Sequence, residues 1–198
     1  MIGRTYNEFR SLFRRLQDSG ELEGFERILE VGALPDERCI LACEELRAVP
    51  EKLGLNLKEM GSFQGIEVVQ GDARHMPFDD DHFDVIIAAS VLEHVPDFWR
   101  AVDEMKRCLK PGGWLIISTP GYGESNLGNK FRKTAKRLGL PDLFQRGTTT
   151  MRIHDAPHDY YRFSQFCYRE VILEGCTDVE VWDIMEPPRI YGMGRLEG

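Results

Sequence analysis

The side chains best suited to chemistry follow three apolar runs of the sequence. Asp72 comes just after the run at 66–69, Ser90 to His94 follow the run at 83–89, and a third run closes at Thr119. A carboxylate accepts hydrogen bonds from amino or hydroxyl groups, and an imidazole can take or release a proton near neutral pH. Their shared position at the ends of apolar runs predicts one common binding site.

The apolar runs themselves predict a parallel β-sheet. They are apolar throughout rather than alternating, which is typical of strands buried on both faces. Residues 97–109 carry apolar side chains at helical spacing, and Lys110 to Gly113 then stop the helix and turn the chain. We therefore expect an α/β fold, a doubly wound, Rossmann-like sheet of about seven mostly parallel strands with helices on both faces. Ligands of such sheets bind outside the carboxyl ends of the strands.

Further elements complete the expected sheet. Strands are expected at 27–31, 52–57 and 179–185, with an antiparallel strand at 189–196, and helices at 4–16, at 37–47 and after a capping Ser164. The N-terminal segment 1–20 is expected to be a helix packed on the domain edge or a lid that excludes water from the active site.

Four short motifs carry a family resemblance. They are Gly71-Asp72-Ala73, the stretch PFDDDHFD at 77–84, LEHV at 92–95 and LKPGG at 109–113. None is specific alone, but their order and spacing within residues 27–120 resemble a class I S-adenosylmethionine (SAM)-dependent methyltransferase. The resemblance implies a Rossmann-like methyltransferase domain with SAM as its cofactor.

The resemblance also implies which residues hold the cofactor. It assigns Asp72 to the adenine amino group, Ala73 to the face of the ring, and Asn56 to the ribose hydroxyls. Two local alternatives remain, because Asp72 could bond its own backbone and Asn56 could cap the following turn. The expected cofactor-binding residues are Glu30, Gly32, Ala33, Asn56, Leu57, Asp72, Ala73 and Ser90.

The loop after the first strand departs from the family pattern. Only Gly32 stands where the family has a glycine, whereas Leu34 and Asp36 replace two others. Loop glycines let the backbone approach a cofactor closely, so this loop must take another path. Asp36 and Glu37 also disfavour a dinucleotide, because a pyrophosphate binds best at a helix start without carboxylates. A nearby acid such as Glu30 suits the sulfonium and ammonium groups of SAM.

Histidines mark the expected acceptor side. His94 follows the strand that should present the methyl group, and His154 and His158 lie in a stretch that continues as HDYYRFS at 158–164. Segments of this form resemble methyltransferases of glycan and cell-envelope pathways, where they lie beside the acceptor pocket. The three histidines are candidate bases or substrate contacts, with structural roles as the alternative. No metal site is expected, since no third ligand has suitable spacing.

Composition restricts the partners and the location. The 198 residues are enough for a single domain at 1–198, and the net charge of -8 disfavours general nucleic-acid binding. No apolar run could form a transmembrane segment and no secretory signal is recognised, so we expect a cytoplasmic protein. The 5 cysteines have no CxxC pair, which indicates reduced thiols. The oligomeric state is open, with a homodimer as one expectation.

A basic segment interrupts this acidic chain. Residues 121–152 form a long insertion, in which positions 124–152 carry seven basic and two acidic side chains. Such a run is usually a solvated face, but the contrast with the rest of the chain favours an anionic acceptor or membrane surface.

The sequence thus predicts SAM-dependent methyl transfer to a small molecule, with a sugar or glycan-linked intermediate as the acceptor. The alternative is a non-catalytic, methyltransferase-like binding or partner protein with an altered cofactor loop.

Overall fold

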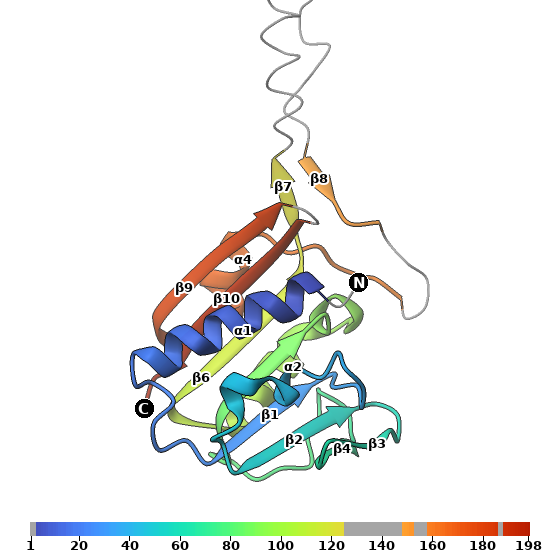
Figure 1. Cartoon of the computed structure of the whole chain (residues 1–198). Helices are drawn as coiled ribbons and strands as arrows, with labels where there is room; N and C mark the ends of the chain where they lie inside the picture. The colour runs from blue at the N-terminus through green and yellow to red at the C-terminus, as the bar shows by residue number, and fades with distance from the viewer. Residues whose placement is uncertain (1–2, 125–147, 153–157, 186–187) are drawn as a thin grey trace, which may run out of the picture.

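One eight-stranded sheet organises the fold (Figure 1). The computed structural model describes residues 3–124, 148–152, 158–185 and 188–198. The strand order is β3-β4-β2-β1-β5-β6-β10-β9, and β7 and β8 form a separate two-stranded sheet. This order confirms the predicted doubly wound sheet, with β3 as an additional edge strand.

The centre of the sheet is parallel, as the apolar runs predict. Neighbouring strands pair in parallel from β4 through β2, β1 and β5 to β6. The five strands are β1 (Arg27–Val31), β2 (Glu51–Asn56), β4 (Ile66–Gln70), β5 (Phe83–Ala89) and β6 (Leu109–Pro120). Their carboxyl ends therefore meet at one edge of the sheet, where a ligand site is expected.

Antiparallel strands flank this centre on both sides. β10 (Pro188–Leu196) pairs antiparallel with both β6 and β9 (Cys176–Met185), which confirms the predicted final strand. β3 (Gly61–Phe63) pairs antiparallel with β4 at the other edge. The small second sheet pairs β7 (Tyr122–Glu124) with β8 (Thr148–Thr150) and joins the two ends of the predicted basic insertion. The basic residues between these two strands lie outside the described residues.

Alternate residues of the central strands fill two cores, one on each face of the sheet. On one face, Ile28 and Ile87 pack in the same cluster as the apolar stripe of α1 (Gly3–Asp18). On the opposite face, Leu29 and Ile86 pack with α2 (Phe98–Cys108). Two short helices extend this second layer: α4 (Gln165–Cys167), capped by Ser164 as predicted, and the π-helical turn η4 (Tyr168–Ile172).

The helix predicted at 37–47 is wrong. The crossover from β1 to β2 contains two 3₁₀ turns instead, η1 (Ile40–Ala42) and η2 (Glu44–Leu46). Cys39 and Cys43 have extended backbone, with ψ angles of 115° and 150°, and this breaks the α-helical repeat twice. Both cysteines are buried, so packing against the sheet outweighs the local helix preference.

Ion pairs fix α1 to this irregular crossover. The carboxylate of Glu45 is buried and accepts hydrogen bonds from Arg10 at 2.9 Å and Arg14 at 2.8 Å. The hydrogen bond from Arg10 is the main cause that lowers the pKa of Glu45 to about 2. The body of the helix is therefore packed on the domain, as one of the two N-terminal predictions states. No helix within the described ranges is long and apolar enough to cross a membrane.

Candidate active site

A cavity of about 280 Å³ opens at the carboxyl ends of β1 and β5. Its wall includes Glu30, Gly32 and Ser90, three of the predicted cofactor residues, together with Tyr6 from the first turn of α1. A larger cavity of about 570 Å³ lies between α1 and the edge strand β9, where no predicted site residue lies. The smaller cavity is the better site, because it lies at the strand ends where ligands of this sheet type bind.

The loop after β1 is tied to the neighbouring strand β2. Gly32 and Ala33 both donate their backbone N–H groups to the carbonyl oxygen of Leu55, at 2.8 and 3.2 Å. Gly32 has a φ of 81°, and a Cβ there would lie 2.5 Å from Cγ2 of Val91. The glycine is thus required by both backbone conformation and contact with the loop after β5.

Glu30 forms a buried acidic part of the cavity wall. One of its carboxylate oxygens accepts the backbone N–H groups of Ile40 at 2.8 Å and Leu41 at 3.2 Å. Burial raises the pKa of Glu30 to about 7, against the lowering effect of these hydrogen bonds. The residue therefore supports the crossover and also places a carboxyl group that titrates near neutral pH in the cavity wall.

The residues predicted to bind ribose and adenine already have local partners. Asn56 donates its amide to the carbonyl oxygen of Ala33 at 2.8 Å, and its side-chain oxygen accepts the N–H of Lys58 at 3.3 Å. Asp72 accepts the backbone N–H of Arg74 at 2.9 Å and forms an ion pair with that guanidinium at 2.6 Å. Both local alternatives considered for Asn56 and Asp72 are therefore present in the structure.

Two further predicted cofactor residues differ in exposure. Ala73 is 8% exposed and packs in the core cluster with α2, so only a small part of it can meet a ligand. Leu57 is 67% exposed and follows Asn56 at the end of β2. An apolar side chain this exposed at a strand end is free to contact an aromatic ring.

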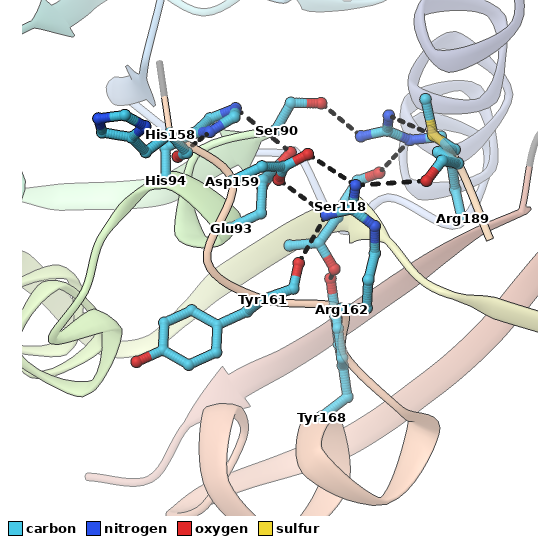
Figure 2. Close-up of polar contacts among 12 residues, drawn as sticks. Ser90, Glu93, His94, Ser118, His158, Asp159, Tyr161, Arg162, Tyr168 and Arg189 are labelled. Carbon is cyan, nitrogen blue, oxygen red and sulfur yellow. Dashed lines mark hydrogen bonds and ion pairs between the residues drawn. The ribbon is translucent and has the colours of Figure 1, made fainter. Parts of the chain in front are cut away.

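The loop after β5 meets the segment at 158–163 (Figure 2). The backbone N–H of Tyr160 donates to the carbonyl oxygen of Glu93 at 2.7 Å, and Nδ1 of His94 lies 2.9 Å from the carbonyl oxygen of His158. The hydroxyl of Tyr161 donates to the carbonyl oxygen of Pro96. These contacts place the backbone of His158 beside the ring of His94, and this hydrogen bond is of the kind expected from the structural alternative for His94. His154, the third candidate, lies outside the described residues.

A cluster of buried charges lies beneath this contact. Asp159 and Arg162 form an ion pair at 2.6 Å, and their side chains are only 1% and 6% exposed. Glu93 is 1% exposed, and within the described part of the chain its Oε2 atom has no hydrogen-bond partner. Burial raises the pKa of Glu93 to about 7, which nearby Arg189 and Arg162 partly oppose.

Arg189 completes the cluster and was not foreseen from the sequence. It reaches from the start of β10 to donate to the hydroxyl of Ser90 at 2.5 Å and to that of Ser118 at 3.3 Å (Figure 2). The only sequence signal was an arginine directly before the apolar Ile190 in an expected strand. Ser90 itself has a φ of 58°, an uncommon conformation that turns this loop at the cavity.

No group of three or more His, Cys, Asp or Glu side chains in the described ranges could hold a metal ion.

Comparisons with known proteins address the family and the fold of the chain. A family model described as "Methyltransferase domain" matches residues 42–117. A demethylmenaquinone methyltransferase of Staphylococcus epidermidis is 42% identical over 66 residues, which cover 31% of this chain and 27% of that enzyme. The chain therefore matches only about a quarter of the length of that relative.

Solved structures share the fold over nearly the whole chain. Haemonchus contortus phosphoethanolamine N-methyltransferase 2 in complex with SAM gives a TM-score of 0.63 at 14% identity, over 97% of this chain and 53% of that chain. The Bacillus subtilis protein YcgJ gives a TM-score of 0.61 at 17% identity, over 94% of this chain and 98% of that chain. At these identities the likeness establishes the fold.

Proposed function

Since this chain carries a class I SAM-dependent methyltransferase domain, we propose that it transfers a methyl group from SAM to a small-molecule acceptor. One observation carries the proposal. The loop after β5 and the segment at 158–163, far apart in sequence, meet at the carboxyl edge of the sheet. Their contact lies beside Ser90, which lines the cavity at the ends of β1 and β5. A cofactor site and an acceptor site would thus adjoin at Ser90.

The cavity wall fits the amino-acid end of SAM. The carboxyl group of Glu30 lies in the cavity wall with Gly32, and a cationic ligand would favour its ionised form. When bound, SAM supplies an electrophilic methyl group on a sulfonium sulfur. Asn56, Leu57, Asp72 and Ala73 would extend the site toward ribose and adenine, and Asp72 would first have to share its carboxylate with a second donor besides Arg74.

The residues of the acceptor side would bind and align the acceptor. His94 and His158 would contact the acceptor or take a proton from it; His154, predicted from the sequence for the same task, lies outside the described residues. Tyr160 is 50% exposed and offers an aromatic surface beside His158. Holding the acceptor in line with the methyl group would be the main contribution of these residues, because alignment alone lowers such a barrier greatly.

Two acceptor classes have separate support. The name of the Staphylococcus epidermidis relative favours a quinone-type acceptor, although the match covers only 31% of this chain. The HDYYRFS segment favours a sugar or glycan-linked acceptor by family resemblance. We propose an acceptor that presents a polar, hydroxylated ring to the loop after β5, a property that reduced quinones and sugars share.

Calorimetric titration with SAM and with S-adenosylhomocysteine tests the cofactor assignment first. We expect both ligands to bind the wild-type chain and to bind an Asp72→Ala variant more weakly. An Asp103→Ala variant, altered on α2, serves as the matched control. Binding that survives unchanged in Asp72→Ala would reject the adenine assignment but keep the enzyme.

Transfer of a labelled methyl group from SAM to panels of demethylated quinols and of sugars then separates the acceptor classes. Folded protein that binds neither SAM nor S-adenosylhomocysteine would favour the alternative, a non-catalytic binding or partner protein. One observation supports this alternative: the crossover between β1 and β2 has 3₁₀ turns in place of a helix.

A further inference from the structure

Arg189 is a buried cation next to the candidate active site. The residue is 6% exposed and lies at the start of β10, where that strand runs beside the carboxyl end of β6. A guanidinium in such a place is costly unless anions or strong acceptors surround it. Its surroundings therefore indicate what it is there to bind.

Within the described residues, the hydrogen-bond partners of Arg189 are all neutral. Its Nη2 donates to Oγ of Ser90 at 2.5 Å and its Nε to Oγ of Ser118 at 3.3 Å. Its Nη1 lies 3.9 Å from the sulfur of Met151. A guanidinium has five N–H donors, so part of its hydrogen-bonding capacity is unused here. Among the described residues, no carboxylate lies within ion-pair distance of it.

The other charged residues of the cluster do not supply an anionic hydrogen-bond partner for Arg189. Arg162 takes up the carboxylate of Asp159 in their own ion pair at 2.6 Å. Glu93 is near enough to interact with Arg189 electrostatically, but its Oε2 accepts no hydrogen bond within the described residues. Arg189 thus retains a fork of donors suited to a planar or tetrahedral anion.

One partner of Arg189 reaches the surface of the cavity. Ser90 is exposed and lines the cavity at the ends of β1 and β5. Because Arg189 donates to its oxygen, the Ser90 hydroxyl hydrogen is left to donate to a ligand. The guanidinium of Arg189 points to the Ser90 hydroxyl and is thereby one hydrogen bond away from the cavity wall (Figure 2).

We propose that Arg189, together with the Ser90 hydroxyl, binds a carboxylate or phosphate group of a ligand held in the candidate active site. The inference rests on the proposed function. The anion has two sources, the amino-acid carboxylate of the cofactor or an acidic group on the acceptor. Both present the same chemistry to a guanidinium, and the experiment below separates them.

The test compares wild-type chain with Arg189→Met, Arg189→Lys and a control, Arg100→Met, whose guanidinium lies on α2 and is 70% exposed. Inorganic phosphate is titrated and followed by NMR shifts of backbone amides, including that of Ser90. We expect saturable binding that weakens about tenfold to a hundredfold in Arg189→Met, because hydrogen bonds to charged groups contribute about 1.5–3 kcal/mol. Arg189→Lys should be intermediate, since it keeps the charge and loses the fork, and Arg100→Met should resemble wild type.

A second titration identifies the source of the anion. S-adenosylhomocysteine and its analogue without the carboxylate are each titrated by calorimetry. If Arg189→Met weakens the first ligand and spares the analogue, the anion is the cofactor carboxylate. If both bind as to wild type while phosphate binding is lost, the anion belongs to the acceptor.

Two results would overturn the proposal. One is the absence of saturable phosphate binding by the wild-type chain, and the other is equal phosphate and cofactor affinity in wild type and Arg189→Met. Circular dichroism and melting of each variant show whether it folds, and Arg189→Lys keeps the test valid if Arg189→Met does not. A wild-type chain that binds phosphate through Arg189 but no S-adenosylhomocysteine would reject the proposed function and leave this anion site standing.

Discussion

The two sides of the carboxyl edge satisfy their polar groups in different ways. On the cofactor side, Asp72 pairs with Arg74 only two residues away, and the two side chains are 33% and 41% exposed. On the acceptor side, Arg189 contacts Ser90, which lies 99 residues away, and both Glu93 and Arg162 are buried. The Asp72 pair is thus local and partly exposed, whereas Arg189 makes a long-range contact and the charged side chains near it are buried.

The two sides are therefore suited to different tasks, one to exchanging partners with a ligand and the other to holding a fixed geometry. Exposed ion pairs contribute little and exchange partners easily, so Asp72 can release Arg74 when a ligand competes. Buried charges hold a fixed geometry, and their unmet hydrogen bonds are costly. Within the described residues, Oε2 of Glu93 and Nε of Arg162 both lack a partner. Preorganised recognition is therefore concentrated on the acceptor side.

The largest expected effect comes from breaking the buried ion pair of the acceptor side. Arg162→Met leaves the carboxylate of Asp159 buried, and we expect a loss of about 3–5 kcal/mol in the free energy of unfolding. Denaturant unfolding at pH 7 measures this loss. Arg27→Met is the matched control, because it breaks an exposed pair with Glu51 at 2.8 Å and should cost much less than Arg162→Met. Equal losses in the two variants would contradict the contrast between buried and exposed charges.

Gly32→Ala should have the next largest effect, since this glycine joins the two sides. The substitution imposes a φ of 81° on alanine and places a methyl group 2.5 Å from Val91. We expect a loss of about 2–3 kcal/mol in unfolding free energy, from left-handed backbone and overpacking together. The double variant Gly32→Ala with Val91→Ala removes the clash and retains the backbone strain. Recovery of part of the loss in the double variant would separate the two causes, and full additivity would show that the two residues do not interact.

Glu93→Gln should change how stability depends on pH. Burial raises the folded-state pKa of Glu93 to about 7, above its usual value of 4.5, so the folded chain holds this proton more tightly than the unfolded chain. The wild-type chain should therefore lose stability as pH rises through the window between these two values, by up to about 3 kcal/mol from this group. Glu30 acts in the same direction and for the same reason. Unfolding at pH 5 and pH 8 should show a smaller decrease in Glu93→Gln, and an unchanged decrease would reject the buried, proton-holding carboxyl.

The sequence was most informative where a segment depends on its own pattern. The run at 83–89 became β5 with the predicted bounds, because strands buried on both faces need apolar residues throughout. The helix expected at 4–16 and the cap at Ser164 were also predicted correctly. The crossover at 37–47 was not, because its backbone depends on how Cys39 and Cys43 pack beneath α1, which is long-range information.

The residues of the candidate site could likewise be predicted where they depend on a local pattern, and not where they depend on long-range contacts. The ends of the predicted strands indicated that Gly32, Ser90 and His94 lie at one edge of the sheet. The HDYYRFS stretch indicated a second segment of the site, and this segment contacts the loop after β5. The contacts of Arg189 could not be predicted, since its partners Ser90 and Ser118 lie in the loop after β5 and on β6, far from it in sequence. The local ties of Asn56 and Asp72 were predictable as alternatives, because each bonds within a few residues of its own turn.

The smallest expected effect tests whether the cofactor side is as loosely held as its contacts indicate. Asn56→Ala removes two hydrogen bonds, from the amide to the carbonyl oxygen of Ala33 at 2.8 Å and from the N–H of Lys58 to the side-chain oxygen at 3.3 Å, and should cost about 0.5–1.5 kcal/mol in unfolding free energy. Asn56→Asp removes the same donor but keeps an acceptor, now a carboxylate, at this position. If the main task of Asn56 is to hold the loop, both variants should weaken S-adenosylhomocysteine binding alike. If the ribose hydroxyls bind here, Asn56→Asp should bind the ligand more tightly than Asn56→Ala, since a carboxylate is the stronger acceptor. Calorimetry on the two variants therefore decides whether this position supports the loop or contacts the cofactor, with Leu57, adjacent and exposed, left unchanged in both.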